Sequence, residues 1–140
     1  ARAWGAGGAI LGRRCMATRE SQIPDKIKAH LVQSSERDTV HIMRSLRNTA
    51  RVYKNKVALE VIEKEQQRAQ FADIRPLVSG QRGKKVYENG EVDAGIWTAG
   101  QTTGLIHAIP TCKELVARIE RDAEQVMTQS AALITPSPRL

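Results

Sequence analysis

The chain has 140 residues, a formal net charge of +7 and an isoelectric point near 9.9, and only 4% of its residues are aromatic. This length fits one domain with a core of its own, and the aliphatic composition favours a mostly helical one. Two distant cysteines, without a Cys-x-x-Cys pair or histidines at metal-ligand spacing, argue against a disulfide framework and a metal site. No run is long enough to cross a bilayer and no signal peptide is recognisable, so we expect a cytoplasmic location and no membrane partner.

A glycine-rich stretch at residues 5–12 leads into two arginines. Its apolar residues 9–11 are flanked by glycines, which predicts a short buried strand. Gly12 then opens a turn whose main-chain N–H groups can face an anion, and Arg13 and Arg14 add positive charge. A solvated glycine-rich loop explains the same residues, because short glycine motifs are weak evidence alone.

Three helices are expected next. One follows Pro24 and buries an apolar stripe formed by Ile27, Leu31 and Val32. A capping-box-like start at residues 35–38 predicts a second helix with its buried side on Val40, Ile42, Met43 and Leu46. Residues 46–52 have no clean period and are interpreted as extended or irregular. The third helix runs from about Lys56 to Arg68.

Shorter helical turns are predicted downstream. Phe71, Ile74 and Val78 share a helical face that Gly80 is placed to end, and another turn at residues 81–88 is closed by a following Asn-Gly pair.

Residues 95–106 are predicted to form a helix with small residues at four positions, which would let it approach another backbone or a flat ligand closely. Trp97 is either a core anchor or a ligand contact, and both interpretations stay open.

The longest helix is expected to start at a capping box at residues 111–114. Its buried side is predicted to consist of Leu115, Val116, Ile119, Ala123, Val126 and Met127. Residues 1–4 are interpreted as the end of a helix, and the segment from Ser130 onward as a fraying tail.

Catalytic chemistry has few candidates in this sequence. His30, His41 and His107 are isolated from any Ser, Cys or acidic partner at a recognisable spacing. No carboxylate pair, Walker motif or zinc motif occurs, so no catalytic residue and no metal ligand is assigned.

Five stretches in one order nevertheless resemble the C-terminal part of the nitronate monooxygenase family, which is also called 2-nitropropane dioxygenase-like and includes NAD(P)H:quinone reductases. They lie at residues 12–20, 36–39, 44–52, 73–83 and 93–101. The resemblance implies an FMN-dependent (β/α)8 barrel longer than this chain. Residues 1–20 would be the last barrel strand and its phosphate loop, residues 21–135 a helical lobe and residues 136–140 a tail.

The same resemblance implies the site residues. Gly12 and Arg13 stand where the family has Gly-Thr on the FMN phosphate, so Arg13 replaces a hydroxyl with a guanidinium. Trp97, Thr98 and Gln101 are the implied contacts to a nitronate, a quinone or NAD(P)H. The family's catalytic histidine would precede Ala1, so we expect this piece to be inactive alone.

The implied activity is flavin-dependent oxidation of nitronates or NAD(P)H-dependent reduction of quinones. Residues 48–51 and 79–83 look more like the quinone-reductase branch. The alternative is a non-catalytic helical module that binds a partner or nucleic acid through a basic face, made of Arg44, Arg47, Arg51 and Lys54. Acidic residues alternate with most of the basic ones, which makes nucleic acid the less favoured partner. The sequence leaves the oligomeric state open.

Overall fold

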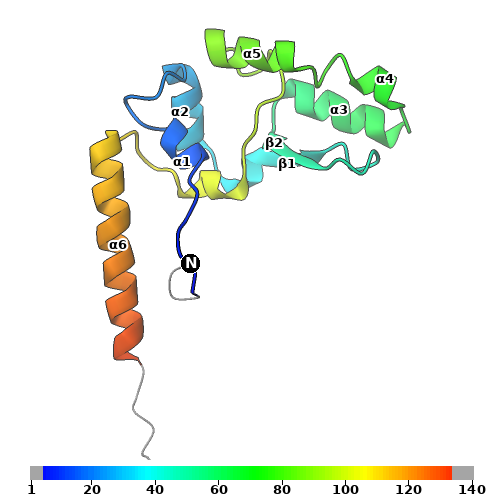
Figure 1. Cartoon of the computed structure of the whole chain (residues 1–140). Coiled ribbons are helices and arrows are strands. Elements are labelled where there is room, and N and C mark those ends of the chain that lie inside the picture. The colour runs from blue at the N-terminus through cyan, green and yellow to red at the C-terminus, as the bar shows by residue number, and fades with distance from the viewer. Residues whose placement is uncertain (1–4, 134–140) are drawn as a thin grey trace, which may run out of the picture.

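The computed structural model describes residues 5–133, and the predictions for residues 1–4 and 134–140 lie outside this range. Helices dominate, and a two-stranded antiparallel sheet lies among them (Figure 1). In chain order the elements are α1 (Arg13–Met16), α2 (Asp25–Gln33), the 3₁₀ helix η2 (Glu36–Asp38), β1 (Thr39–Ile42), β2 (Ala50–Tyr53), α3 (Lys56–Gln66), α4 (Phe71–Ile74), α5 (Gly80–Asn89), the 3₁₀ helix η3 (Gln101–Leu105) and α6 (Cys112–Ala132).

The predicted strand at residues 9–11 is not formed. Ile10 is fully exposed and Leu11 is half exposed, and the backbone there has no regular structure. A strand needs a neighbouring strand for its backbone hydrogen bonds, and within residues 5–133 the β1–β2 pair is the only sheet. The prediction of a buried strand is therefore wrong for the chain as the structure describes it.

A β-hairpin replaces the second predicted helix. The capping box is present, because Ser35 and Asp38 bond reciprocally, but it starts only the single turn η2. β1 follows immediately and pairs with β2, with Val40 opposite Val52 and His41 opposite Arg51. Three of the four residues of β1 are β-branched and favour a strand over the helix that the capping box suggested, and the region interpreted as extended or irregular supplies β2.

Glu65 of α3 holds the hairpin loop in place. Its carboxylate accepts hydrogen bonds from the main-chain N–H groups of Met43 at 2.7 Å and Ser45 at 3.0 Å, and from the Ser45 hydroxyl at 2.7 Å. Met43 has a positive φ of 56° in this loop, a conformation that few non-glycine residues adopt. The helix thus stabilises a strained turn.

This contact predicts a pH dependence of stability. Burial raises the pKa of Glu65, but the hydrogen bonds from Ser45 and Met43 outweigh it and bring the pKa below the ordinary value of 4.5. A depressed pKa in the folded state stabilises the fold above pH 4.5, and this stabilisation is lost as the pH falls through the lowered value. In urea unfolding, we expect Glu65→Gln to be less stable than wild type at pH 7, with a difference that shrinks on acidification. The exposed Glu63→Gln is the matched control, and a pH-independent deficit of Glu65→Gln would contradict the assignment.

The helix predictions after Pro24 and from Lys56 are confirmed by α2 and α3. Ile27 and Leu31 are fully buried in α2, and Asn55 begins α3 by accepting a hydrogen bond from the main-chain N–H of Ala58. The turn at residues 81–88 is confirmed as α5, which ends at Gly90 in the left-handed conformation. Gly80, however, is the first residue of α5 and does not end the preceding turn.

Residues 95–106 do not form the predicted helix. Residues 96–100 are extended, η3 follows, and burial alternates from Trp97 through Thr98 to Ala99 as in a strand. The N–H of Tyr53 donates to the Trp97 carbonyl at 3.0 Å, so the segment lies along β2 as a short bridge. Glycines at three positions disfavour a helix, whereas Ile96, Trp97 and Thr98 favour extended backbone.

Two small hydrophobic clusters lie on either side of this segment. One contains Trp97, which stacks on Tyr53 with ring centroids 4.4 Å apart, together with the buried residues Ala17, Ile27, Leu31, Val86, Ala99 and Ile106. The other is formed by the hairpin, α3 and α4, with the buried residues Ile42, Val52, Val57, Ala58, Val61, Ile74 and Leu77. The core-anchor interpretation of Trp97 is confirmed.

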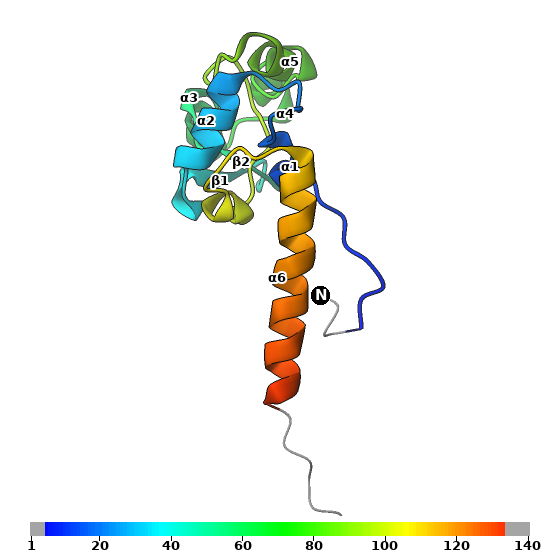
Figure 2. The ribbon, with the colours of Figure 1, turned by 90° about the vertical axis from the view of Figure 1, so that its left-hand side faces the viewer.

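Helix α6 projects away from the rest of the molecule (Figure 2). The predicted capping box is confirmed, since Thr111 and Glu114 bond reciprocally. Of the predicted buried side, however, only Leu115 is buried, and Val116, Val126 and Met127 are each about half exposed. The sequence pattern predicted the helix and its apolar stripe correctly, but within residues 5–133 no element covers most of that stripe. None of the helices in this range is both long and apolar enough to cross a bilayer.

Candidate functional site

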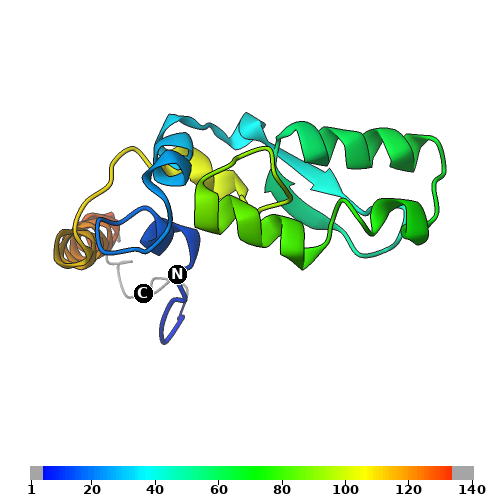
Figure 3. The same ribbon diagram turned by 90° about the horizontal axis from the view of Figure 1, so that it is seen from above.

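The predicted cofactor loop meets the predicted substrate segment across the fold. Seen from above, the N-terminal segment and α6 lie toward the same end of the molecule, away from the hairpin, α3 and α4 (Figure 3). Arg13, the first residue of α1, donates from Nε to the carbonyl oxygen of Thr98 at 3.2 Å, joining positions 85 residues apart. The structure therefore brings together two sets of residues that the sequence singled out separately.

A pocket of about 590 Å³ opens at this junction. We call it the N-terminal pocket, and it is lined by Ile10, Leu11, Gly12, Arg13, Arg14, Met16, Thr98 and Thr102. Its volume lies in the usual range for small-molecule sites. Apolar side chains line one part and two arginines and two threonines another, which suits a flat ring joined to an anionic group.

The two arginines of the pocket differ in their free donors. Arg14 is committed to main-chain carbonyls, with Nη1 donating to Ala17 at 3.1 Å and Nη2 to Ala108 at 3.2 Å. Burial, followed by repulsion from Arg118, lowers the pKa of Arg14. Arg13 uses only Nε, so its Nη N–H groups have no hydrogen-bond partner within residues 5–133. Arg13 is therefore the arginine available to an anion in this pocket.

Gly12 immediately precedes α1 and leaves its backbone open. A Cβ at this position would have no heavy atom within 4 Å, so the main chain there is accessible. Thr98 is exposed at the pocket, whereas Trp97 is buried in the core with 1% of its surface accessible. Gln101 is exposed in a smaller neighbouring pocket that it shares with Thr102. Of the three predicted substrate contacts, the structure brings only Thr98 to the N-terminal pocket.

Thr102 and Met16 line the N-terminal pocket, although the sequence analysis did not single them out. Thr102 lies four residues after Thr98, and η3 turns it back toward the same pocket. The sequence feature that could have indicated Thr102 is its hydroxyl, the second after that of Thr98 within residues 95–106. Met16 has no such feature apart from its position after the two arginines.

Glu20 fixes the C-terminal end of the loop that contains Gly12 and Arg13 to α6. Both of its carboxylate oxygens accept from the main-chain N–H of Cys112, at 2.9 and 3.0 Å. This hydrogen bond at a helix N-terminus lowers the pKa of Glu20. Thr18 adds two contacts by donating to the Cys15 carbonyl at 2.8 Å and accepting from the Cys112 thiol at 3.6 Å. The loop with Gly12 and Arg13 is therefore anchored at its C-terminal end.

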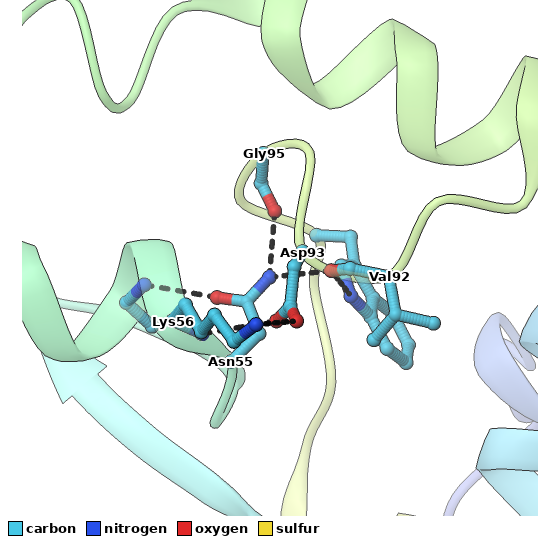
Figure 4. Close-up of polar contacts among 7 residues, drawn as sticks. Asn55, Lys56, Val92, Asp93 and Gly95 are labelled. Atoms are coloured by element: carbon cyan, nitrogen blue, oxygen red, sulfur yellow. Dashed lines mark hydrogen bonds and ion pairs between the residues drawn. The ribbon is translucent and has the colours of Figure 1, made fainter.

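Asn55 organises the segment that leads into Thr98 (Figure 4). Its buried side-chain amide donates to the carbonyl oxygens of Val92 at 2.6 Å and Gly95 at 2.8 Å. Lys56 adds a main-chain hydrogen bond and an ion pair to Asp93, at 3.1 and 3.5 Å. These contacts tie residues 92–95 to the start of α3 and so place Trp97 and Thr98 at fixed positions.

The basic residues of the alternative interpretation lie elsewhere, on the hairpin. Arg51 on β2 donates to the Thr39 hydroxyl at 2.9 Å, and Arg44 lies in the hairpin loop. Both arginines line a separate pocket together with His41. None of the three histidines lines the N-terminal pocket. Within residues 5–133 there is no group of three or more His, Cys, Asp or Glu residues placed to hold a metal ion, and Cys15 and Cys112 are free thiols.

The comparisons with known proteins define the class. A family model described as nitronate monooxygenase matches residues 1–122, and the chain belongs to this family. The chain is also 24% identical over 167 residues to the (3aS,4S,5R,7aS)-5-hydroxy-7a-methyl-1-oxo-octahydro-1H-indene-4-carboxyl-CoA dehydrogenase of Mycobacterium tuberculosis, covering 94% of this chain and 47% of that protein.

Among solved structures, FabK from Thermotoga maritima superposes with a TM-score of 0.86 at 26% identity, covering 95% of this chain and 42% of FabK. A mutant of the same enzyme gives a TM-score of 0.79 at 24% identity, covering 95% and 39%. The chain therefore spans less than half the length of these relatives. It is mostly helical and corresponds to about two fifths of a TIM-barrel protein, which confirms the coarse fold class.

Proposed function

We propose that this chain forms the phosphate-binding and substrate-side part of a flavin-dependent oxidoreductase. The main observation in support is the N-terminal pocket, where Gly12 and the free Nη groups of Arg13 lie beside Thr98. Family membership and the dehydrogenase relative support the oxidoreductase class. We place the protein in the cytoplasm, with small molecules as its substrates.

The residues present fit FMN at this pocket. The main-chain N–H of Gly12 and the Nη groups of Arg13 would hold the phosphate, and the apolar side chains of Leu11 and Met16 would cover part of the ring system. FMN supplies electron transfer from a nitronate or NAD(P)H to oxygen or a quinone. Thr98, with Thr102 beside it and Gln101 in the adjacent pocket, would orient the substrate.

A comparison of FMN with riboflavin, which lacks the phosphate, tests this proposal in the purified protein. We expect FMN to bind roughly 10-fold to 100-fold more tightly, because a charge-assisted hydrogen bond contributes about 1.5–3 kcal/mol. Arg13→Gln should remove most of this preference for FMN over riboflavin. The measurement is quenching of flavin fluorescence on titration.

Arg37→Gln is the matched control, since it removes the same charge from a side chain that is 91% exposed and outside the pocket. Equal affinities for FMN and riboflavin would refute the phosphate site. Absence of any flavin binding would refute the flavin assignment itself.

We propose quinone reduction with NAD(P)H as the more favoured of the two activities, on the sequence resemblance at residues 48–51 and 79–83. In the complete enzyme, bleaching of bound flavin by NADH or NADPH, followed by reoxidation with a quinone, would support it. Flavin reduction by a nitronate, with release of nitrite and a carbonyl compound, would favour nitronate oxidation instead.

A further inference from the structure

Arg13 makes a second contact with the substrate-side segment, beyond its hydrogen bond to Thr98. The end of its guanidinium lies where a side chain at Gly100 would stand. A Cβ at Gly100 would be 2.5 Å from Nη1, 3.2 Å from Cζ and 3.7 Å from Nη2 of Arg13. Arg13 therefore occupies a space that exists only because residue 100 has no side chain.

The backbone of Gly100 does not itself require glycine. Its φ of −109° and ψ of 173° are extended values that any residue adopts. The three nearest heavy atoms to a Cβ at this position all belong to Arg13. Neither a turn nor a neighbouring main chain requires glycine at position 100, and the guanidinium of Arg13 is the nearest group that a side chain there would have to displace.

We propose that Arg13 is a positioning residue that holds residues 98–102 against the cofactor loop, and that Gly100 is the position that admits it. This proposal rests on the proposed function in one respect only, which is the description of residues 98–102 as the substrate side. With Nε committed to Thr98 and its Nη groups available, one side chain joins the two sides of the N-terminal pocket. A threonine, which the resemblance implies for position 13, lacks the length for such a contact.

Hydrogen–deuterium exchange of the purified protein without flavin tests the contact directly. Arg13→Lys keeps the charge but loses the Nε donor, and Gly100→Ala displaces the guanidinium. We expect the amides of residues 98–102 to exchange about fivefold faster in both variants, the effect of losing one hydrogen bond. Arg37→Lys is the matched control and should change nothing in this segment.

Thermal unfolding separates positioning from general stability. Because Gly100→Ala displaces only the mobile end of one side chain, its melting temperature should stay close to that of wild type while exchange rises locally. In an Arg13→Ala background the space is empty, so Gly100→Ala should add no further exchange. An equal effect of Gly100→Ala in both backgrounds, or unchanged exchange in Arg13→Lys, would overturn the proposal.

The two proposals fail in different ways. If the wild-type protein binds no flavin, the flavin assignment is refuted, but the hydrogen–deuterium exchange test of the Arg13 contact stays valid. Unchanged exchange in Arg13→Lys refutes the positioning role even when FMN binds more tightly than riboflavin.

Discussion

Asn55→Ala should lower the free energy of unfolding by about 3 kcal/mol or more, the largest effect we expect from a single side-chain truncation here. The variant removes both amide donors from the carbonyl oxygens of Val92 and Gly95 and the acceptor that caps α3 at Ala58. Val92 keeps a hydrogen bond from the Trp97 indole at 3.3 Å, whereas the Gly95 carbonyl loses its amide partner. Urea unfolding followed by tryptophan fluorescence measures the loss.

Two further variants separate the contributions at this position. Asn55→Asp keeps the acceptor for Ala58 but loses both donors and brings a charge close to two carbonyl oxygens, so it should be as destabilising as alanine. Asn89→Ala removes an exposed amide with one weak 3.4 Å contact to Glu91 and should change stability by less than about 0.5 kcal/mol. A small effect of Asn55→Ala, comparable with that of Asn89→Ala, would show that residues 92–95 are held by other contacts.

Gly95→Ala is the second large effect, expected at about 3 kcal/mol. A Cβ at Gly95 would lie 2.4 Å from the carbonyl carbon of Arg82 and 2.7 Å from the main-chain nitrogen of Gly83. These are backbone atoms of α5, so the helix itself must move to admit one methyl group. The shift would also strain the 2.9 Å hydrogen bond from Arg82 Nε to the Ala94 carbonyl.

Gly80→Ala is the matched control for this prediction. It adds the same methyl group within α5 itself, but apart from the neighbouring residues of the helix no heavy atom lies within 4 Å of the added Cβ. We expect it to be neutral or stabilising by up to about 1 kcal/mol, because alanine favours helix more than glycine does. Equal destabilisation by Gly95→Ala and Gly80→Ala in urea unfolding would contradict the close packing of residue 95 on α5.

The sequence predicted those helices whose signals are local. α2, α3 and α6 have apolar residues at helical spacing, and Asn55 and Thr111 supply the caps that start two of them. The hairpin was missed because the capping box at Ser35 suits a single 3₁₀ turn as well as a longer helix. Strand pairing depends on a partner far along the chain, so no local pattern distinguishes these outcomes.

At residues 96–100 the sequence pattern predicted a helix, but the structure has an extended segment. Small residues were correctly associated with close approach, since Gly95 touches the backbone of α5 and Gly100 touches Arg13. The predicted helical spacing was wrong. Trp97 and Ala99 are buried and Thr98 between them is exposed, which is the two-residue repeat of a strand. An alternation of only three residues is too short to outweigh a helical interpretation on sequence alone.

The sequence indicated only some of the residues that line the N-terminal pocket, and it did not indicate their geometry. The resemblance pointed to five residues, Gly12, Arg13, Trp97, Thr98 and Gln101. The structure brings Gly12, Arg13 and Thr98 to one pocket, but neither Trp97 nor Gln101 lines it. The difference between Arg13 and Arg14 depends on which carbonyl oxygens each guanidinium meets, at Thr98 or at Ala17 and Ala108. Those contacts come from the tertiary fold, so neighbouring arginines look equivalent in sequence.

Helix α6 is a long rod attached to the rest of the molecule near its N-terminal end. Its 21 residues extend for about 30 Å, and near its N-terminal end Cys112 bonds to Glu20 and Leu115 is buried. A tilt of about 10° at that end moves the other end by about 5 Å over this length. Because Glu20 is hydrogen-bonded to the first residue of α6, we expect a tilt of this helix to displace the loop that carries Arg13.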